Sequence, residues 1–461
     1  MKKISLFSLA VLIIASIDNI RNLPAAALFG SSLIFFFFAA AIAFLIPTAL
    51  VSAELSAMFP DKGGVYFWVN RAFGEKWAMT AIWLQWINTM VWYPTILSFL
   101  AGTLAYLFDP TIAESKAYLI GVILTVFWGL TFVNLKGIRI SALLNNIFAL
   151  IGTILPIIFL IILGAVWISK GQPLQISLDA KSIIPNFKDA TNWSSLIAIM
   201  ACFLGIELSG VHVNDIRNPQ KNFPRAILIA TGFIFVSLLF GSLSIAFVLP
   251  EGEISLVSGI MQVFTSFFDA FGMRKFIPIL TVLIVIGSTG TMINWLISPA
   301  KGLLHASEFG FLPAFFAKKN AHGVAGRILL TQAVIVSLVC LVFLLVPSVN
   351  AFYWFLTALS TELYMMMYVL TFGACIALHY RYKNRPKSFK IPGKNLGMIL
   401  VTALGLIGCA TTIVVSFFPP ENIDIGNPVH YVGMILIGNI VTISPLFLFF
   451  LYQKRKKGLL K

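Results

Sequence analysis

The chain has 461 residues, of which 59% are hydrophobic and only 11% charged, and its mean hydropathy is +0.95. Soluble domains are about a quarter charged, so this composition excludes a soluble globular protein and predicts a polytopic membrane protein. The formal net charge of +15 is spread over loops and a short basic tail. It therefore indicates membrane topology and not a nucleic-acid-binding patch.

Twelve apolar segments are long enough to cross a bilayer, since a spanning helix needs roughly 20 apolar residues. They cover residues 4–29, 32–53, 77–107, 117–134, 143–168, 193–214, 226–249, 276–305, 328–347, 352–379, 396–418 and 431–452. An even number of spans places both termini on one side of the membrane. Twenty-five of the 32 lysine and arginine residues fall on that side and six on the other, which predicts that both termini are cytoplasmic.

Polar residues interrupt the first span between two apolar stretches, and Pro24 follows them. Irregular backbone at membrane depth is tolerated only where it is buried in protein or lines a water-filled cavity. The interruption therefore predicts part of a substrate-binding site. The candidate residues there are Ser16, Ile17, Asp18, Asn19 and Arg21.

Asp18 and Arg21 are three residues apart, and two interpretations of them remain open. If the break keeps a helical turn, the two side chains form a neutral pair that holds the break shut. Alternatively, Asp18 receives the ammonium group of a substrate and Arg21 its carboxylate. The unpaired amides and carbonyls of an unwound helix would assist, and such a pocket suits a zwitterionic amino acid.

A second interruption lies in the sixth span, where Gly205, Ile206, Glu207 and Ser209 are the candidate site residues. Two broken spans at corresponding places in two halves indicate the binding site of a secondary transporter. Each break opens a group of five spans, so the second group must insert in inverted orientation. The sequence thus predicts inverted repeats over residues 1–192 and 193–395, followed by accessory helices 11 and 12 and the tail over 396–461.

Three of the 17 acidic residues lie well inside the predicted spans, namely Asp18, Glu207 and Glu362. A charged side chain at the bilayer centre costs about 3 kcal/mol, so each is a candidate functional residue. Glu207 either bridges the broken helix as a structural or gating residue, or binds protons or substrate directly. Tyr364 and Tyr368 share one helix face beside Glu362, and they form either a gate or an aromatic packing surface.

Other features exclude several classes of function. The four cysteines lie inside spans without a CxxC pair, and the five histidines show no metal-ligand spacing. Nucleotide-binding motifs are missing too, so we expect no cofactor. No catalytic cluster lies at one membrane depth, which argues against an enzyme. Trp92–Tyr93 and Asn294–Trp295 are weaker site candidates that more often reflect packing.

Four motifs, in this order along the chain, resemble those of amino acid/polyamine/organocation permeases. They are residues 54–74 after the second span, 205–207 with 218–227 around the end of the sixth, 299–313 after the eighth, and 389–393 before the eleventh. The resemblance implies a LeuT-like fold, transport of amino acids by alternating access, and no enzymatic activity.

Two shorter segments, residues 212–215 and 417–423, resemble the bacterial glutamate/γ-aminobutyrate antiporter branch of these permeases. This narrower resemblance implies an amino acid antiporter of the inner membrane. It also implies a gating role for the tenth span, at Glu362, Tyr364 and Tyr368. A proton-coupled symporter of amino acids or polyamines is the alternative function, and a channel is the alternative from another class.

Overall fold

The computed structural model describes residues 5–59, 64–137, 142–187, 191–208, 216, 218–308, 310, 312–383 and 389–459, and the regular elements of these segments are all helices. The α-helices are α1 (Leu6–Ile17), α2 (Leu23–Ala27), α3 (Leu33–Ala40), α4 (Ile46–Met58), α5 (Val65–Phe73), α6 (Glu75–Ala105), α7 (Lys116–Leu135), α8 (Ala142–Ala149), α9 (Leu155–Ser169), α10 (Ala180–Ile183), α11 (Ser195–Cys202), α12 (Pro219–Ala246), α13 (Gly259–Ala270), α14 (Ile277–Glu308), α15 (Ala314–Ala317), α16 (Gly326–Cys340), α17 (Val349–Arg381), α18 (Lys394–Val415), α19 (Pro428–Ile443) and α20 (Pro445–Leu459).

Ten helical segments of the described chain are long and apolar enough to cross a membrane. They are Leu6–Ala27, Gly30–Met58, Lys116–Leu135, Asn146–Ser169, Lys221–Ala246, Arg274–Leu304, Gly326–Leu344, Val349–Arg381, Lys394–Val415 and Pro428–Arg455. The protein is therefore a multi-pass membrane protein.

Two predicted spans are not among these ten segments. The third, at 77–107, coincides with the 31-residue helix α6, which is less apolar because it carries Gln85, Asn88 and several tryptophans. The sixth, at 193–214, begins with the eight-residue helix α11 and then loses its regular helical form. These two segments fail the length or hydropathy criterion because the first contains polar residues and the second is interrupted.

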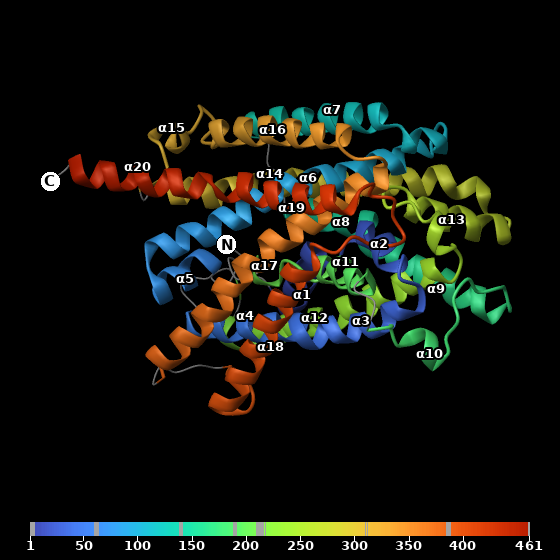
Figure 1. Cartoon of the computed structure of the whole chain (residues 1–461), viewed down its shortest axis with the longest axis horizontal. Helices are drawn as coiled ribbons and strands as arrows, with labels where there is room; N and C mark the ends of the chain where they lie inside the picture. Colours follow the sequence, from blue (N-terminus) through green and yellow to red (C-terminus); the bar gives the residue numbers. More distant parts are fainter. Residues whose placement is uncertain are drawn as a thin grey trace.

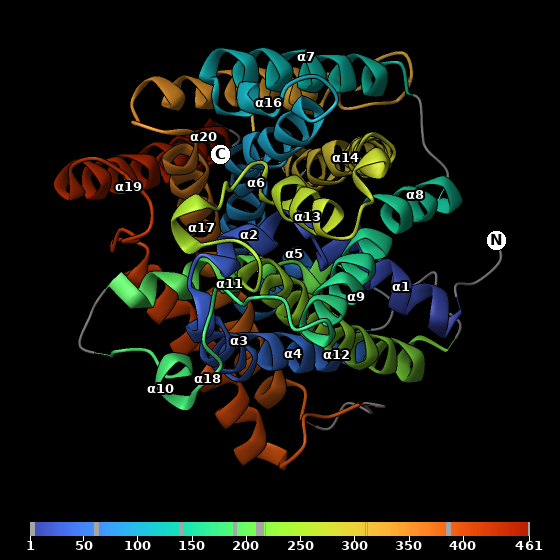
Figure 2. The same cartoon turned by 90° about the vertical axis from the view of Figure 1, so that its right-hand side faces the viewer.

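Several helices lie along the longest axis of the molecule, as α7, α16 and α20 show most clearly, whereas α17 and α18 run obliquely to it (Figure 1). The short helices α5 and α15 and the end of α20 lie at the left end of this view, whereas α10 and α13 lie at the right end. Figure 2, which looks down that axis, places α2, α6, α11 and α17 near the centre. The two interrupted segments therefore meet in the middle of the helical array.

The first predicted break is confirmed, and local residue chemistry explains it. α1 ends at Ile17, and the backbone of Asp18 and Asn19 is extended. The Asn19 side chain then accepts a hydrogen bond from the amide of Arg21 at 3.3 Å, which caps a 3-10 turn over Ile20–Asn22. Pro24 lies in the first turn of α2, where a missing amide proton costs nothing.

The second predicted break is confirmed as far as Leu208. α11 ends at Cys202, and Gly205 follows with a φ of +110°, a conformation that L side chains rarely adopt. Residues 206–208 form a 3-10 turn. Ser209 and Gly210, which complete the predicted interruption, lie outside the described residues.

Two glycines allow a very close crossing between neighbouring helices. Gly152 lies in the π-helical turn Leu150–Ile154 that precedes α9, and it faces Gly287 of α14. A methyl group on Gly152 would lie 2.6 Å from the Cα atom of Gly287. The backbones of the two helices are therefore in direct contact, without side chains between them.

We expect Gly287→Ala to destabilise the protein, because the added methyl group would meet the backbone of Gly152. Overpacking of this kind costs about 1–3 kcal/mol, which should appear as a lower melting temperature of the purified protein. Gly129→Ala in α7 is the matched control, since a methyl group there meets nothing within 4 Å. Equal melting temperatures for the two variants would contradict the close crossing.

Candidate functional site

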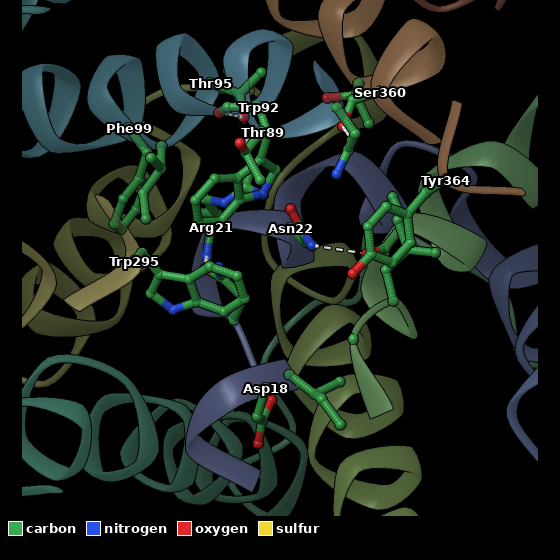
Figure 3. Close-up of a pocket in the computed structure, with 18 of the residues that line it drawn as sticks. Asp18, Arg21, Asn22, Thr89, Trp92, Thr95, Phe99, Trp295, Ser360 and Tyr364 are labelled. Atoms are coloured by element: carbon green, nitrogen blue, oxygen red, sulfur yellow. Dashed lines mark hydrogen bonds between the residues drawn. The ribbon is translucent and has the colours of Figure 1, made fainter. Parts of the chain in front are cut away.

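A cavity of about 90 Å³ lies where the two broken segments meet α6, α14 and α17. Its wall combines the end of α1, the turn that follows it, and residues on both sides of the second break. The lining residues are Ala15, Ile17, Asp18, Asn19, Arg21, Asn22, Asn88, Thr89, Trp92, Thr95, Ile96, Phe99, Thr153, Ala201, Leu204, Gly205, Leu208, Ser288, Thr291, Trp295, Thr357, Ser360, Thr361 and Tyr364. Figure 3 shows part of this wall.

Arg21 is the cationic residue of the cavity wall, and only 4% of it is exposed. Its Nη1 atom donates to the hydroxyl of Thr95 at 2.8 Å and to that of Tyr353 at 3.1 Å. The Tyr353 hydroxyl in turn donates to the backbone carbonyl of Arg21 at 3.1 Å. The guanidinium therefore has a fixed position, although every partner that holds it is neutral.

The Arg21 guanidinium has more donors than its neighbours use, since both of its described side-chain hydrogen bonds come from Nη1. The guanidinium carbon lies 4.9 Å from the centre of the Trp92 ring, and Figure 3 shows the two side chains together. The Nε atom is buried without a hydrogen-bond acceptor among the described residues. A buried cation with a free donor is a favourable partner for a carboxylate, because charge-assisted hydrogen bonds are roughly twice as strong as neutral ones.

Asp18 is equally buried but lies apart from Arg21 in Figure 3. Its Oδ2 atom accepts a hydrogen bond of 2.8 Å from Ser237 of α12, and its Oδ1 atom has no donor among the described residues. Asp18 and Arg21 form no ion pair in this part of the chain. The extended backbone at Asp18 and Asn19 removes the helical turn that such a pair would need.

The turn after α1 also contains unpaired backbone groups, and one of its residues, Asn19, lines the cavity. The amides of Asn19 and Ile20 have no hydrogen-bond partner among the described residues. The Asn22 side chain donates to the carbonyl of Ala201 at 3.4 Å and so joins the two broken segments. Free amides and a buried arginine are groups of the kind that bind anions in proteins.

Glu207 lies behind the cavity wall and ties the second break to its neighbours. Its Oε1 atom accepts hydrogen bonds from Tyr364 at 2.6 Å and from Gln85 at 3.3 Å. Tyr368 donates to the Oε2 atom, and the Tyr368 hydroxyl accepts the amide of Gly205 at 3.1 Å. This arrangement matches the bridging interpretation of Glu207, since the carboxylate connects the broken segment to α6 and α17.

The three candidates of the tenth predicted span separate in the structure. Tyr364 lines the cavity, whereas Tyr368 reaches it only through Glu207 and Gly205. Glu362 does not line the cavity. Its Oε2 atom accepts a hydrogen bond of 2.9 Å from Asn439 of α19, so it faces a peripheral helix.

The remaining candidates have mixed positions. Ile17, Asn19 and Gly205 line the cavity, whereas Ile206 is fully buried away from it. Ser16 lies in α1, but its side chain is outside the described part of the structure, as are the Asn294 side chain and Ser209. Of the weaker candidates, Trp92 and Trp295 both line the cavity and pack against each other at 5.2 Å between ring centres.

Sequence reasoning missed most of the polar wall. Asn88 and Thr95 are polar residues of α6 that lie on one helical face with the aromatic residues Trp92 and Phe99, at spacings of three and four residues. A polar stripe within an otherwise apolar span was the available signal. Tyr353, which holds Arg21 from α17, had no such signal because buried tyrosines are common in packing surfaces.

The chain is similar to known membrane transporters over most of its length. The sequence model of a family described as amino acid permease matches residues 4–440. An uncharacterized transporter of Legionella pneumophila is 40% identical over 99% of this chain and 97% of its own length. A glutamate/gamma-aminobutyrate antiporter of Lactococcus lactis is 28% identical over 98% and 92%, and a probable agmatine/putrescine antiporter of that species is 24% identical over 91% and 88%.

We expect Tyr368→Phe to destabilise the protein by about 1–3 kcal/mol, the usual cost of leaving buried polar groups unpaired. The change removes the donor to Glu207 and the acceptor for the Gly205 amide. Melting temperatures of purified protein provide the measurement. Tyr380→Phe, at a ring that is 48% exposed, is the control and should change little; a similar loss in both variants would contradict the bridging role of Tyr368.

Proposed function

The chain belongs to the amino acid permease family, and we propose that it is an antiporter that exchanges amino acids across the inner membrane by alternating access. Membership of this family makes the protein a transporter and not an enzyme. The observation that carries the proposal is the central cavity, in which a buried acid and a buried base lie unpaired at a helix break. The name of the Lactococcus lactis glutamate/gamma-aminobutyrate antiporter supports exchange as the mode of transport.

The proposed architecture is twelve spans in a five-plus-five inverted repeat, over residues 1–192 and 193–395, with accessory helices over 396–461. The ten apolar segments, α6 and the interrupted segment that begins with α11 supply twelve candidates. The proposed cytoplasmic side contains both termini, α5 and α15. The gathering of α5, α15 and the end of α20 at one end of Figure 1, opposite α10 and α13, supports this topology.

A zwitterionic amino acid fits the charges of the cavity. The substrate carboxylate would bind the guanidinium of Arg21 and the free amide of Asn19. The substrate ammonium group would bind the Oδ1 atom of Asp18. The two charged groups of the substrate then pair with buried groups that lack partners. A buried charge contributes favourably to binding when it gains such a partner.

The same charges disfavour a diamine. Among the described wall residues, the charged groups are one acid and one base, so the wall is neutral overall and matches a substrate of zero net charge. A second positive charge about 4 Å from Arg21 would be repelled by roughly 4 kcal/mol at an effective dielectric constant of 20. We therefore propose amino acids as substrates in preference to polyamines. γ-Aminobutyrate has zero net charge and matches the wall directly, whereas glutamate has the same ammonium–carboxylate pair and one further carboxylate.

The second break is proposed to act in gating. Tyr364 contributes to the cavity wall and also donates to Glu207, while Tyr368 holds the amide of Gly205. A movement of α17 would therefore directly displace the residues of the second break. A substrate that contacts Tyr364 lowers the free energy of the closed state only if it binds that state more tightly than the open ones.

Exchange predicts that efflux of labelled amino acid from proteoliposomes requires substrate on the outside. Vesicles loaded with labelled glutamate or γ-aminobutyrate should lose label rapidly when the unlabelled compound is added outside, and slowly into plain buffer. A symporter would release label without external substrate, provided that its coupling ion could also leave. A channel would release label without saturation, so rapid efflux into plain buffer would exclude the antiporter.

We expect Asp18→Asn and Arg21→Lys each to weaken substrate binding by about 1–3 kcal/mol, or roughly 5-fold to 150-fold. Asp18→Asn removes the negative charge that would face the substrate ammonium group. The lysine keeps the charge but lacks the planar fork that suits a carboxylate. The apparent affinity of counterflow measures both effects.

The matched controls are Asp269→Asn and Arg274→Lys, which alter an exposed ion pair of 3.5 Å far from the cavity. Exposed pairs of this kind contribute roughly 0–1 kcal/mol, so both controls should keep the wild-type affinity. An unchanged affinity in Asp18→Asn, with normal expression, would remove Asp18 from the proposed substrate site.

A further inference from the structure

A buried acid in the middle of α17 lies outside the cavity and has no role in the exchange described above. Only 2% of Glu362 is exposed, and it faces Asn439 of α19. The segment Pro428–Arg455, which contains α19, is the least buried of the ten apolar segments at 17%, and α19 lies at the edge of Figure 2. Asn439 is thus a polar residue of a peripheral helix whose amide points inward, to a carboxyl group.

Glu362 has no cationic partner in the described structure. The titratable side chains on the elements packed against α17 are Lys394 and Cys409 of α18, His430 and Tyr431 of α19, Glu75, Lys76 and Tyr93 of α6, Tyr66 and Arg71 of α5, Glu54 of α4 and Cys202 of α11. None of the cations among them forms an ion pair with Glu362. Tyr431 donates instead to the carbonyl of Ser416, at 3.1 Å.

The amide of Asn439, which hydrogen-bonds Glu362, has an oxygen atom without a donor in the described structure. The Nδ2 atom of Asn439 donates to Glu362 at 2.9 Å, yet the Oδ1 atom of Asn439 is buried without any donor among the described residues. An ionised carboxylate can only accept hydrogen bonds, so it cannot satisfy this oxygen. A protonated carboxyl group has an O–H donor, and a neutral acid also avoids the cost of a buried charge without a counter-ion.

We infer that Glu362 and Asn439 form a proton-binding site, separate from the amino acid cavity, that couples the transport cycle to protons. Binding forms one O–H bond on the Glu362 carboxylate, and the acid then donates to the Oδ1 atom of Asn439. Release returns this proton to water and leaves an anion, which requires water to reach the contact between α17 and α19. The coupling part of this inference rests on the proposed transport function, whereas proton binding itself does not.

Infrared spectroscopy of the protein in lipid nanodiscs tests proton binding without any transport. At pH 7 the difference spectrum between wild type and Glu362→Gln should show loss of a protonated carboxyl band. Glu253→Gln, at an exposed glutamate, is the control and should lose the band of an ionised carboxylate. Loss of an ionised carboxylate band in Glu362→Gln would overturn the inference.

Asn439→Leu provides a second test if Glu362→Gln does not fold. This variant removes the acceptor of the proposed O–H group, so the carboxyl band of Glu362 should shift towards that of a weakly bonded acid. An unchanged spectrum in Asn439→Leu would overturn the proposed contact.

Transport measurements then test the coupling. Proteoliposomes loaded with unlabelled amino acid should exchange it for external labelled amino acid faster when a proton gradient is applied, and Glu362→Gln should lose this stimulation but keep counterflow without a gradient. A stimulation that persists in Glu362→Gln, or that is missing in wild type, would overturn the coupling. A wild-type protein without counterflow would count against the proposed antiporter, and the infrared test of proton binding would still apply.

Discussion

Hydrocarbon offers no hydrogen-bond partners to a polypeptide backbone, and this constraint explains most of the polar structure inside the protein. Once α1 ends at Ile17, the next residues must find partners within the protein or face a cavity. Tyr353 of α17 satisfies one backbone group by donating to the carbonyl of Arg21. Thr95 of α6 and Ser237 of α12 hydrogen-bond the side chains of Arg21 and Asp18. These contacts leave the Oδ1 atom of Asp18 and the Nε atom of Arg21 without partners among the described residues, and both residues line the cavity.

Three buried acids illustrate how the surroundings of one type of side chain decide its role. Asp18 keeps an unpaired oxygen at a cavity wall, so a ligand can use it. The carboxylate of Glu207 has three side-chain donors and joins helices together. Glu362 has an amide beside it and no cation among the described residues, so a proton is the partner that it lacks. Burial alone does not distinguish the three.

The sequence was sufficient to locate both breaks, because Pro24, Asn19 and Gly205 are residues whose local preferences end or restart a helix. It could not decide whether Asp18 pairs with Arg21, since that depends on two backbone angles at Asp18 and Asn19. Nor could it show that Tyr364 lines the cavity and Glu362 does not, because the positions of the neighbouring helices decide which face of α17 meets the cavity. The polar stripe on α6 was visible in the sequence, but Trp92 within it resembled ordinary packing.

The contact between Gly152 and Gly287 bears on how this protein could diverge in evolution. Each glycine is followed directly by a residue of the cavity wall, Thr153 in one helix and Ser288 in the other. A larger side chain at either glycine would push the helices apart and carry those two wall residues with them. The crossing thus acts as a spacer that sets the width of the cavity from outside it. Descendants of this gene could acquire selectivity for bulkier substrates through the spacer, while every residue that touches the substrate stays the same.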